Sequence, residues 1–226
     1  MRVSRRAFLK ASGLAFSAAL LPPTPPDEAP RPIFDLGRTT RTINVYDRPS
    51  FQADVVVLVG ADTVFKIYST VLSQEASYNP AWYQVRRGYV YSGHVQPVRW
   101  QLQTPSLEAP AEGFLGEITV PYSISKTWRN ANAAWVYRLY YGTTYWMAAA
   151  EKDEEGRIWY QVYDERLGQY SWVVGEHVRR VSKEEVAPLS PNVRDKRIEI
   201  NLEKQTFQCF ENGAKVLDTL CSTGIY

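Results

Sequence analysis

Hydrophobic and polar residues alternate along most of this chain in short runs, the period that is typical of β-strands. In the first half, the runs 42–46, 55–59, 63–68 and 82–85 are rich in β-branched and aromatic residues. Glycine, proline, aspartate or asparagine separates these runs, as in a small barrel. Near the end, Ile198, Ile200 and Leu202 fall on one strand face, and Asn212-Gly213 is a hairpin turn signal. The pattern therefore predicts an all-β protein.

Two segments in the middle of the chain repeat the same order of residues. The first has Trp-Tyr-Gln-Val at 82–85 and His-Val-Gln-Pro-Val at 94–98. The second has Trp-Tyr-Gln-Val at 159–162 and His-Val-Arg-Arg-Val at 177–181, and in both an aromatic strand lies between. The interval from tryptophan to histidine is longer in the second segment, which predicts a longer hairpin there. Such a repeat indicates duplication of one small β-unit.

Proline-rich stretches divide the chain and set the domain boundaries that we predict. We expect a signal at 1–21, a linker at 22–40, a β-domain at 41–99, a linker at 100–115, a second β-domain at 116–182, a linker at 183–193 and the start of a third domain at 194–226.

The N-terminus resembles a twin-arginine export signal. Arg5 and Arg6 precede a short apolar run at 11–21 that ends before a cluster of prolines. The competing interpretation is an ordinary amphipathic helix. The resemblance implies an exported protein, located in the periplasm, the cell wall or outside the cell, that uses the twin-arginine translocation machinery as a partner. Whether the signal is cleaved or kept as an anchor stays open.

Charge and motifs limit the other partners. The formal net charge is +2, but four of the 26 basic residues lie in the first nineteen residues, which contain no acids. The rest is slightly acidic, so we expect no nucleic-acid partner. The export route often carries cofactor-loaded redox proteins, which makes such a protein a minor alternative. However, no metal or nucleotide motif is present, so we predict no cofactor, no metal site and a monomer.

The first repeat resembles a bacterial SH3-like domain through Asn-Val-Tyr-Asp-Arg-Pro-Ser at 44–50, the step at 59–64, the strand 82–85 and Gly-Tyr-Val at 88–90. The second is similar mainly through 159–181, and its first half lacks the Pro-Ser step. The resemblance implies two small barrels in tandem that bind peptidoglycan.

Aromatic residues of the two repeats are the candidates for that binding. They are Trp82, Tyr89, Trp159, Tyr160 and Trp172. The competing interpretation places most of them in the barrel cores. Because side chains alternate along a strand, only one of Trp159 and Tyr160 is expected to face the interior, with its neighbour exposed or packed on the adjacent domain.

The last thirty residues or so resemble the opening of an L,D-transpeptidase catalytic domain. The shared order is Ile-x-Ile-x-Leu at 198–202, an aromatic strand, the Asn-Gly turn, an apolar strand and Ser-Thr-Gly at 222–224. In that family a cysteine nucleophile cross-links peptidoglycan, and the resemblance implies that this nucleophile lies beyond residue 226. No catalytic residue is therefore assigned in this chain. The alternative is a non-catalytic wall-binding or scaffold protein.

The cysteines and histidines receive no firm role from the sequence. The Asn-Gly turn predicts a hairpin register that pairs Cys209 with Val216 and puts Cys221 opposite Lys204, which argues against a disulfide. His94 and His177 occupy equivalent places in the repeat, so we expect a shared structural duty. The acidic run 151–155 is interpreted as a solvated hairpin tip.

Overall fold

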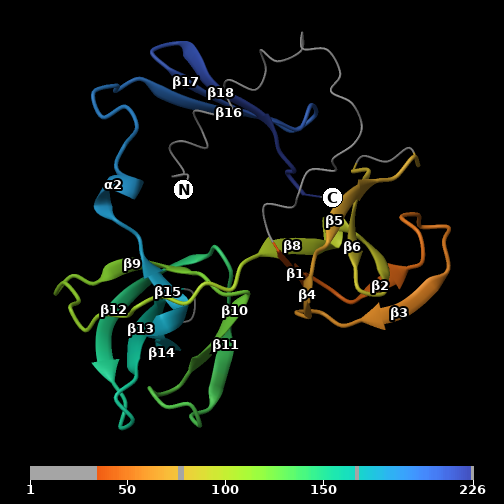
Figure 1. Cartoon of the computed structure of the whole chain (residues 1–226). Coiled ribbons are helices and arrows are strands. Elements are labelled where there is room, and N and C mark those ends of the chain that lie inside the picture. Colours follow the sequence, from red (N-terminus) through yellow and green to blue (C-terminus); the bar gives the residue numbers. More distant parts are fainter. Residues whose placement is uncertain (1–34, 76–78, 166–167, 225–226) are drawn as a thin grey trace. The chain divides into compact units, whose positions relative to one another are not determined.

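The computed structural model describes residues 35–75, 79–165 and 168–224 and is almost entirely β (Figure 1), so the all-β prediction is confirmed. The predicted export signal, with Arg5 and Arg6, lies outside the described residues. One compact unit contains both repeats and ends at Val181, and a second unit contains the C-terminal strands. Within the first unit we call residues 35–99 the first lobe and residues 100–181 the second lobe. None of the described helices is long and apolar enough to cross a membrane.

The first lobe has eight strands and one short 3-10 helix. They are β1 (Leu36–Thr39), β2 (Ile43–Tyr46), β3 (Val55–Val59), β4 (Val64–Lys66), β5 (Ser69–Leu72), β6 (Ala81–Val85), β7 (Gly88–Tyr91), η2 (Ser92–His94) and β8 (Val95–Val98). Their order is β4-β1-β8 in one sheet and β3-β2-β7-β6-β5 in the other. The buried Ile67 marks the bend between β4 and β5, where the chain passes from one sheet to the next.

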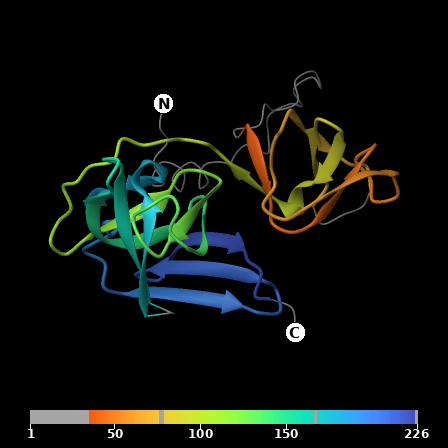
Figure 2. The same ribbon diagram turned by 90° about the horizontal axis from the view of Figure 1, so that it is seen from below.

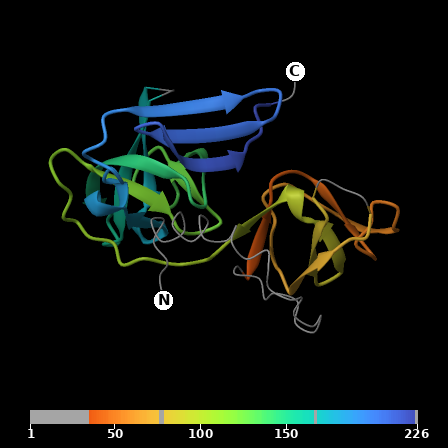
Figure 3. The same ribbon diagram turned by 90° about the horizontal axis from the view of Figure 1, so that it is seen from above.

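The second lobe has one seven-stranded sheet. Its elements are β9 (Phe114–Ile118), β10 (Tyr122–Lys126), β11 (Trp135–Tyr140), β12 (Thr144–Lys152), β13 (Ile158–Asp164), β14 (Gln169–Val174), η3 (Gly175–His177) and β15 (Val178–Arg180). The strand order is β11-β10-β14-β13-β12-β9-β15. Figures 2 and 3 show that each lobe wraps its strands around its own interior. Among the described residues, the strand pairings close neither lobe into a complete barrel.

The two lobes share one topology. If β4 and β5 are counted as one bent strand equivalent to β12, every strand pairing of the first lobe has a counterpart in the second. The register also agrees: Trp82 pairs with Tyr91, as Trp159 pairs with Val174. The structural repeat therefore extends over the whole of both lobes, beyond the segment in which the sequences resemble each other.

The sequence similarity between the lobes also includes a glycine in the first strand of each lobe, ahead of the repeated segments. Gly37 in β1 and Gly116 in β9 lie in equivalent Leu-Gly steps. A Cβ atom at Gly37 would lie 2.6 Å from Val95 Cγ1, and one at Gly116 would lie 2.6 Å from Val178 Cγ1. The first lobe thus begins at Leu36, ahead of residue 41, because β1 pairs with both β4 and β8.

The loop after β2 has the same hydrogen bonds as the loop after β10. The backbone N–H of Gln52 donates to Ser50 Oγ at 2.9 Å, and that of Asn132 donates to Asn130 Oδ1 at 2.7 Å. Both side chains can accept a bond from the backbone two residues on. Asn130 therefore takes the place of the serine in the Pro-Ser step that the second repeat lacks.

Each lobe has its own hydrophobic core. The core of the first is formed by Ile43, Val45, Val85, Val90 and Val95. The larger core of the second is formed by Phe114, Ile118, Val120, Leu139, Met147, Tyr160, Val162, Val173 and Val178.

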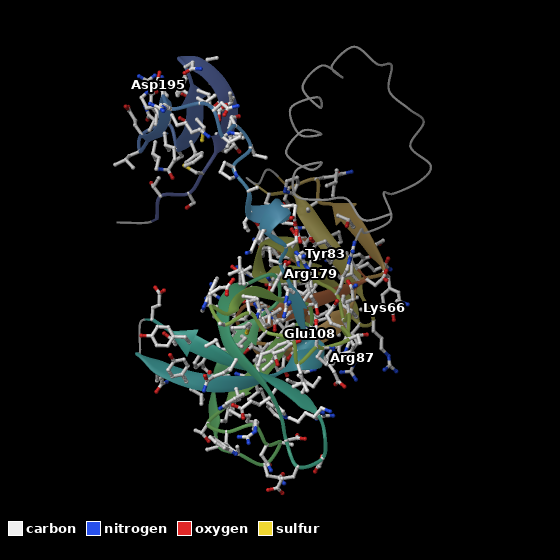
Figure 4. The ribbon with its side chains drawn as sticks, turned by 90° about the vertical axis from the view of Figure 1, so that its left-hand side faces the viewer. Lys66, Tyr83, Arg87, Glu108, Arg179 and Asp195 are labelled. Carbon is white, nitrogen blue, oxygen red and sulfur yellow. The ribbon has the colours of Figure 1, made fainter. Side chains whose placement is uncertain are left out.

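The predicted linker 100–115 ends inside β9, and the part that precedes this strand, 100–113, is held against the second lobe. The backbone N–H of Gln103 donates to the carbonyl of Glu176 at 2.8 Å. The Tyr160 hydroxyl accepts from the backbone N–H of Ser106 at 2.9 Å and donates to its carbonyl at 3.2 Å. Arg180 donates to the carbonyl of Glu108, which lies on this lobe (Figure 4). This segment therefore belongs to the second lobe structurally.

Charged residues join the two lobes. Asp62, in the turn between β3 and β4, forms an ion pair with Arg38 of β1 and another, at 3.2 Å, with Arg138 of β11. The Tyr140 hydroxyl also donates to Asp62, at 3.3 Å, and the Arg38 guanidinium lies 4.1 Å from the centre of the Tyr140 ring. Gln96 adds a hydrogen bond to the carbonyl of Tyr141 at 3.1 Å.

The C-terminal unit is a three-stranded antiparallel sheet after the short helix α2 (Lys183–Val186). Its strands are β16 (Lys196–Asn201), β17 (Thr206–Glu211) and β18 (Ala214–Leu220), in the order β16-β17-β18. The predicted turn is present, because Glu211 pairs with Ala214. The predicted pairing of Cys209 with Val216 is wrong: a bulge shifts the register, and Cys209 pairs with Leu217. The backbone N–H of Cys221 donates to the carbonyl of Gln205 at 2.8 Å, next to Lys204, the approximate position predicted for it.

Candidate aromatic binding pocket

The candidate site is a pocket in the first lobe, between β2 and β7. Its volume is about 230 Å³, and it is lined by Arg41, Thr42, Ile43, Asn44, Tyr46, Phe51, Tyr91 and His94. Among the described residues, β2 and β7 pair at one position only, Tyr46 with Tyr89. Beyond that pair the two strands diverge, and the pocket occupies the gap. We call it the β2–β7 pocket.

Aromatic rings form one wall of the β2–β7 pocket. The ring centres of Phe51 and Trp82 are 4.9 Å apart, and those of Phe51 and Tyr91 are 5.0 Å apart. Tyr46 meets Trp82 edge-on at 5.6 Å. Edge-to-face and tilted contacts of this kind are favourable and hold each ring in one orientation. Trp82 is buried beneath the cluster, whereas Phe51 is 45% exposed and presents an open ring to solvent.

The loop that carries Phe51 is fixed by Glu75. The Ser50 hydroxyl donates to the Glu75 carboxylate, which also accepts from the backbone N–H of Phe51 at 3.4 Å. The Phe51 ring is thus anchored from its backbone side as well as by its ring contacts.

Polar groups form the opposite rim. Arg41 is exposed and lowers the pKa of His94 by electrostatic repulsion, an effect that adds to the larger effect of burial. Both effects disfavour the charged form of His94, and Arg41 is the other basic side chain of the lining. Asn44 completes the rim, where its amide nitrogen donates to the Tyr46 hydroxyl at 3.3 Å. Among the described residues, no hydrogen bond or ion pair engages the Arg41 side chain.

The second lobe has different residues at the equivalent positions. By the register of the strands and loops, Tyr46 corresponds to Lys126, Phe51 to Ala131 and Tyr91 to Val174. In addition, the Ser123 hydroxyl and His177 Nδ1 are 2.7 Å apart and bridge the gap between β10 and η3. Among its described residues, the second lobe therefore lacks the aromatic side chains that form the wall of the β2–β7 pocket.

Four of the five aromatic residues that we predicted from sequence are buried. Trp82, Trp159, Tyr160 and Trp172 are at most 4% exposed, and Tyr89 is half-buried. Their rings are not available as an open stacking face. Trp82 alone contributes to the candidate site, as the base of the aromatic cluster.

Only one of Trp159 and Tyr160 faces the interior, as predicted, but the other is not exposed, since both are buried. They do face opposite sides of β13, as alternation requires. Tyr160 packs in the core, whereas Trp159 lies on the outer face and donates its indole N–H to Asp153 at 2.8 Å. The hairpin tip at 153–157 thus contacts the Trp159 side chain through Asp153.

Phe51, Tyr46 and Arg41, which form the pocket with Tyr91, were not among the binding residues predicted from sequence. The signal was present in the loop after the β2 run, where Tyr46 and Phe51 flank the Pro-Ser step. The prediction also omitted Trp128 and Trp135 of the second lobe, both more than half exposed. Arg129 lies 4.5 Å from the centre of the Trp128 ring and forms an ion pair with Glu151 at 3.2 Å.

The described residues offer a binding surface more readily than a reaction centre. Within them, no group of three or more histidine, cysteine, aspartate or glutamate side chains lies close enough together to hold a metal ion. Cys209 and Cys221 are free thiols in the C-terminal sheet. His177 is engaged by Ser123, and burial lowers its pKa.

Comparison of the chain with protein-family models and with curated proteins finds no match. The functional interpretation therefore depends on the residues and their geometry.

Proposed function

We propose that this chain is the N-terminal portion of an exported L,D-transpeptidase whose two SH3-like lobes hold the protein on peptidoglycan. The observation that carries the binding function is the β2–β7 pocket. It combines a rigid aromatic wall, one exposed ring and an unneutralised guanidinium in a cavity of about 230 Å³. Concave sites with aromatic walls and a few polar groups are the usual form of small ligand sites.

The duplicated topology supports the choice of a binding module. Small β-units that occur twice before another domain are suited to presenting a ligand surface, and the loop between β2 and β3 contributes Phe51 to the pocket. Support for the enzyme class comes from the strand-turn-strand order of β16, β17 and β18, which follows the sequence pattern that resembles the transpeptidase opening.

The catalytic part of the proposal assigns the nucleophile to residues beyond Tyr226. A thiolate nucleophile needs a neighbouring base or cation, and no such group is assigned to Cys209 or Cys221 here. Sequencing the source DNA past codon 226 tests this part. A continuing frame with a histidine and a Ser-x-Gly-Cys motif supports the transpeptidase, whereas a stop codon supports the alternative of a non-catalytic wall-binding or scaffold protein.

Sedimentation with insoluble peptidoglycan tests the binding part. The full chain without residues 1–21 is mixed with purified sacculi and centrifuged, and the bound fraction is measured. We expect the protein to pellet, and Phe51→Ala to reduce the bound fraction several-fold because it removes the exposed ring of the pocket. Leu58→Ala is the matched control, since Leu58 is an exposed apolar residue of β3 outside the pocket. A chain that stays in the supernatant would refute wall binding.

Export is tested separately. Replacing Arg5 and Arg6 with lysine keeps the charge but removes the arginine pair on which the proposed route depends. We expect the protein to accumulate inside the cell when the pair is replaced. Unchanged export of the variant would exclude the twin-arginine route and leave the wall-binding proposal standing.

A further inference from the structure

We propose that the β2–β7 pocket takes the carboxylate end of a short peptide with small side chains, which lies along β2 with its carboxylate on Arg41. This inference rests on the proposed wall binding, because it names the chemical group that the same pocket would hold.

The charge of the pocket favours an anion. Arg41 is exposed, and among the described residues no acidic side chain pairs with it. Glu75 is the acid bound to the loop of the pocket, but its carboxylate is engaged by Ser50 and by the backbone of Phe51, and it does not line the cavity. A guanidinium binds a carboxylate through paired N–H donors. Aromatic clusters also bind quaternary ammonium groups, but the Arg41 charge at the rim opposes any cationic ligand.

The geometry of the strands favours a peptide over a sugar. Because β2 and β7 pair only at Tyr46 and Tyr89, the side of β2 that faces the pocket has backbone groups without a neighbouring strand there. An extended peptide can pair with such an open strand edge. Sugar rings stack on open aromatic faces, and here the large Trp82 ring is 1% exposed, which leaves Phe51 as the open ring of the cluster. The open edge of β2 is therefore the feature that favours a peptide.

The size of the pocket limits the side chains. Its volume of about 230 Å³ is below the usual range for drug-sized ligands, roughly 300–1,000 Å³. One or two residues with methyl side chains fit this description better than a bulky peptide. Phe51 is the exposed ring against which such a methyl group would pack.

In the second lobe, side chains close the space that is equivalent to the β2–β7 pocket. There the Ser123 hydroxyl bridges to His177, whereas Ile43 occupies the equivalent strand position in the first lobe and cannot make this bond. His94 instead contacts the Tyr91 ring at 5.3 Å. We therefore expect one peptide site per chain, in the first lobe.

The test compares two probes that differ only in charge, N-acetyl-D-alanyl-D-alanine and its C-terminal carboxamide. Each is titrated into the isotopically labelled full chain without residues 1–21, and binding is followed by NMR. We expect the acid to bind about tenfold more tightly than the carboxamide, the size of one charge-assisted hydrogen bond. The shifted signals should include Arg41 and His94 in the first lobe and leave the second lobe unchanged.

Two substitutions sharpen the result. Arg41→Gln should remove the preference for the acid, while Arg41→Lys should keep part of it, because lysine retains the charge without the planar fork. Lys66→Gln is the matched control, because this substitution also removes one positive charge. Lys66 extends from β4 at the surface (Figure 4) and lines no part of the β2–β7 pocket. Thermal unfolding of each variant checks that folding is unaffected.

Equal affinity of the wild-type chain for the acid and the carboxamide would overturn the inference. An equal loss of the preference for the acid in Arg41→Gln and Lys66→Gln would also overturn it. If the protein also pellets with sacculi, only the carboxylate assignment fails and wall binding stands. If it neither pellets nor binds either probe, both proposals fail.

Discussion

Asp62 of the first lobe forms an ion pair with Arg138 of the second, with 3.2 Å between the carboxylate oxygen and the guanidinium nitrogen. The same carboxylate binds Arg38, whose side chain is only 8% exposed. Asp62 therefore neutralises two arginines at the junction of the lobes. Its backbone has a φ of 60°, a conformation that aspartate and asparagine tolerate better than most residues.

Substitution of Asp62 tests this junction. Asp62→Asn keeps the backbone preference but leaves the buried Arg38 without its counter-ion. We expect a loss of about 3 kcal/mol in the free energy of unfolding, measured by urea denaturation. Asp47→Asn is the control, because Asp47 pairs with the exposed Arg48 and its loss should cost less than about 1 kcal/mol. Equal effects of the two substitutions would show that the junction contributes little.

Glycine substitutions test the close packing of the first strand in each lobe. Gly37→Ala and Gly116→Ala each place a methyl group 2.6 Å from a valine, so we expect a loss of about 1–3 kcal/mol from overpacking. Gly60→Ala is the control, since a Cβ there meets no heavy atom within 4 Å. Chemical denaturation of the three variants measures the difference. Wild-type stability in Gly37→Ala would contradict the proposed packing of β1.

The stability of the chain should fall in mild acid. Burial lowers the pKa of His177; the nearby Arg157 lowers it further and Glu176 partly opposes this. The folded chain therefore takes up the proton at lower pH than the unfolded chain, whose histidine has a pKa near 6.5. The stabilising effect is fully present above about pH 6.5 and is lost as the pH falls toward and through the folded pKa.

Thermal unfolding at several pH values between 7.5 and 5 measures this effect. We expect His177→Gln to be less stable at pH 7.5, because it alters the contact with Ser123, but to lose less stability on acidification. His94, whose pKa is lowered in the same direction, should account for part of the remaining slope. An identical pH dependence in wild type and His177→Gln would exclude His177 as a source.

The sequence was sufficient to predict the strands and the repeat, but local patterns could not show every boundary. The Trp-Tyr-Gln-Val runs align in register because both pair with the following strand through the same residues. The strand β1 was missed because its Leu-Gly signal is short and its partners, β4 and β8, lie far along the chain.

The burial of the aromatic candidates was not predictable from alternation alone. Alternation assigns faces to Trp159 and Tyr160 correctly, but it does not show that the outer face of β13 is covered. Asp153 contributes to that cover by accepting the Trp159 indole N–H, a contact that the alternation of side chains does not reveal. The pocket was missed for a similar reason: Tyr46, Phe51 and Tyr91 come together only because β2 and β7 diverge.

The difference between the lobes sets the valency of the chain. If the β2–β7 pocket binds peptidoglycan as proposed, one pocket in two copies of the fold gives each chain a single contact with the polymer. Transfer of Tyr46, Phe51 and Tyr91 to positions 126, 131 and 174 would create a bivalent chain. Two linked contacts raise overall avidity through effective concentration when their spacing permits both to bind. The residues at positions 126, 131 and 174 therefore limit the proposed wall binding to one contact per chain.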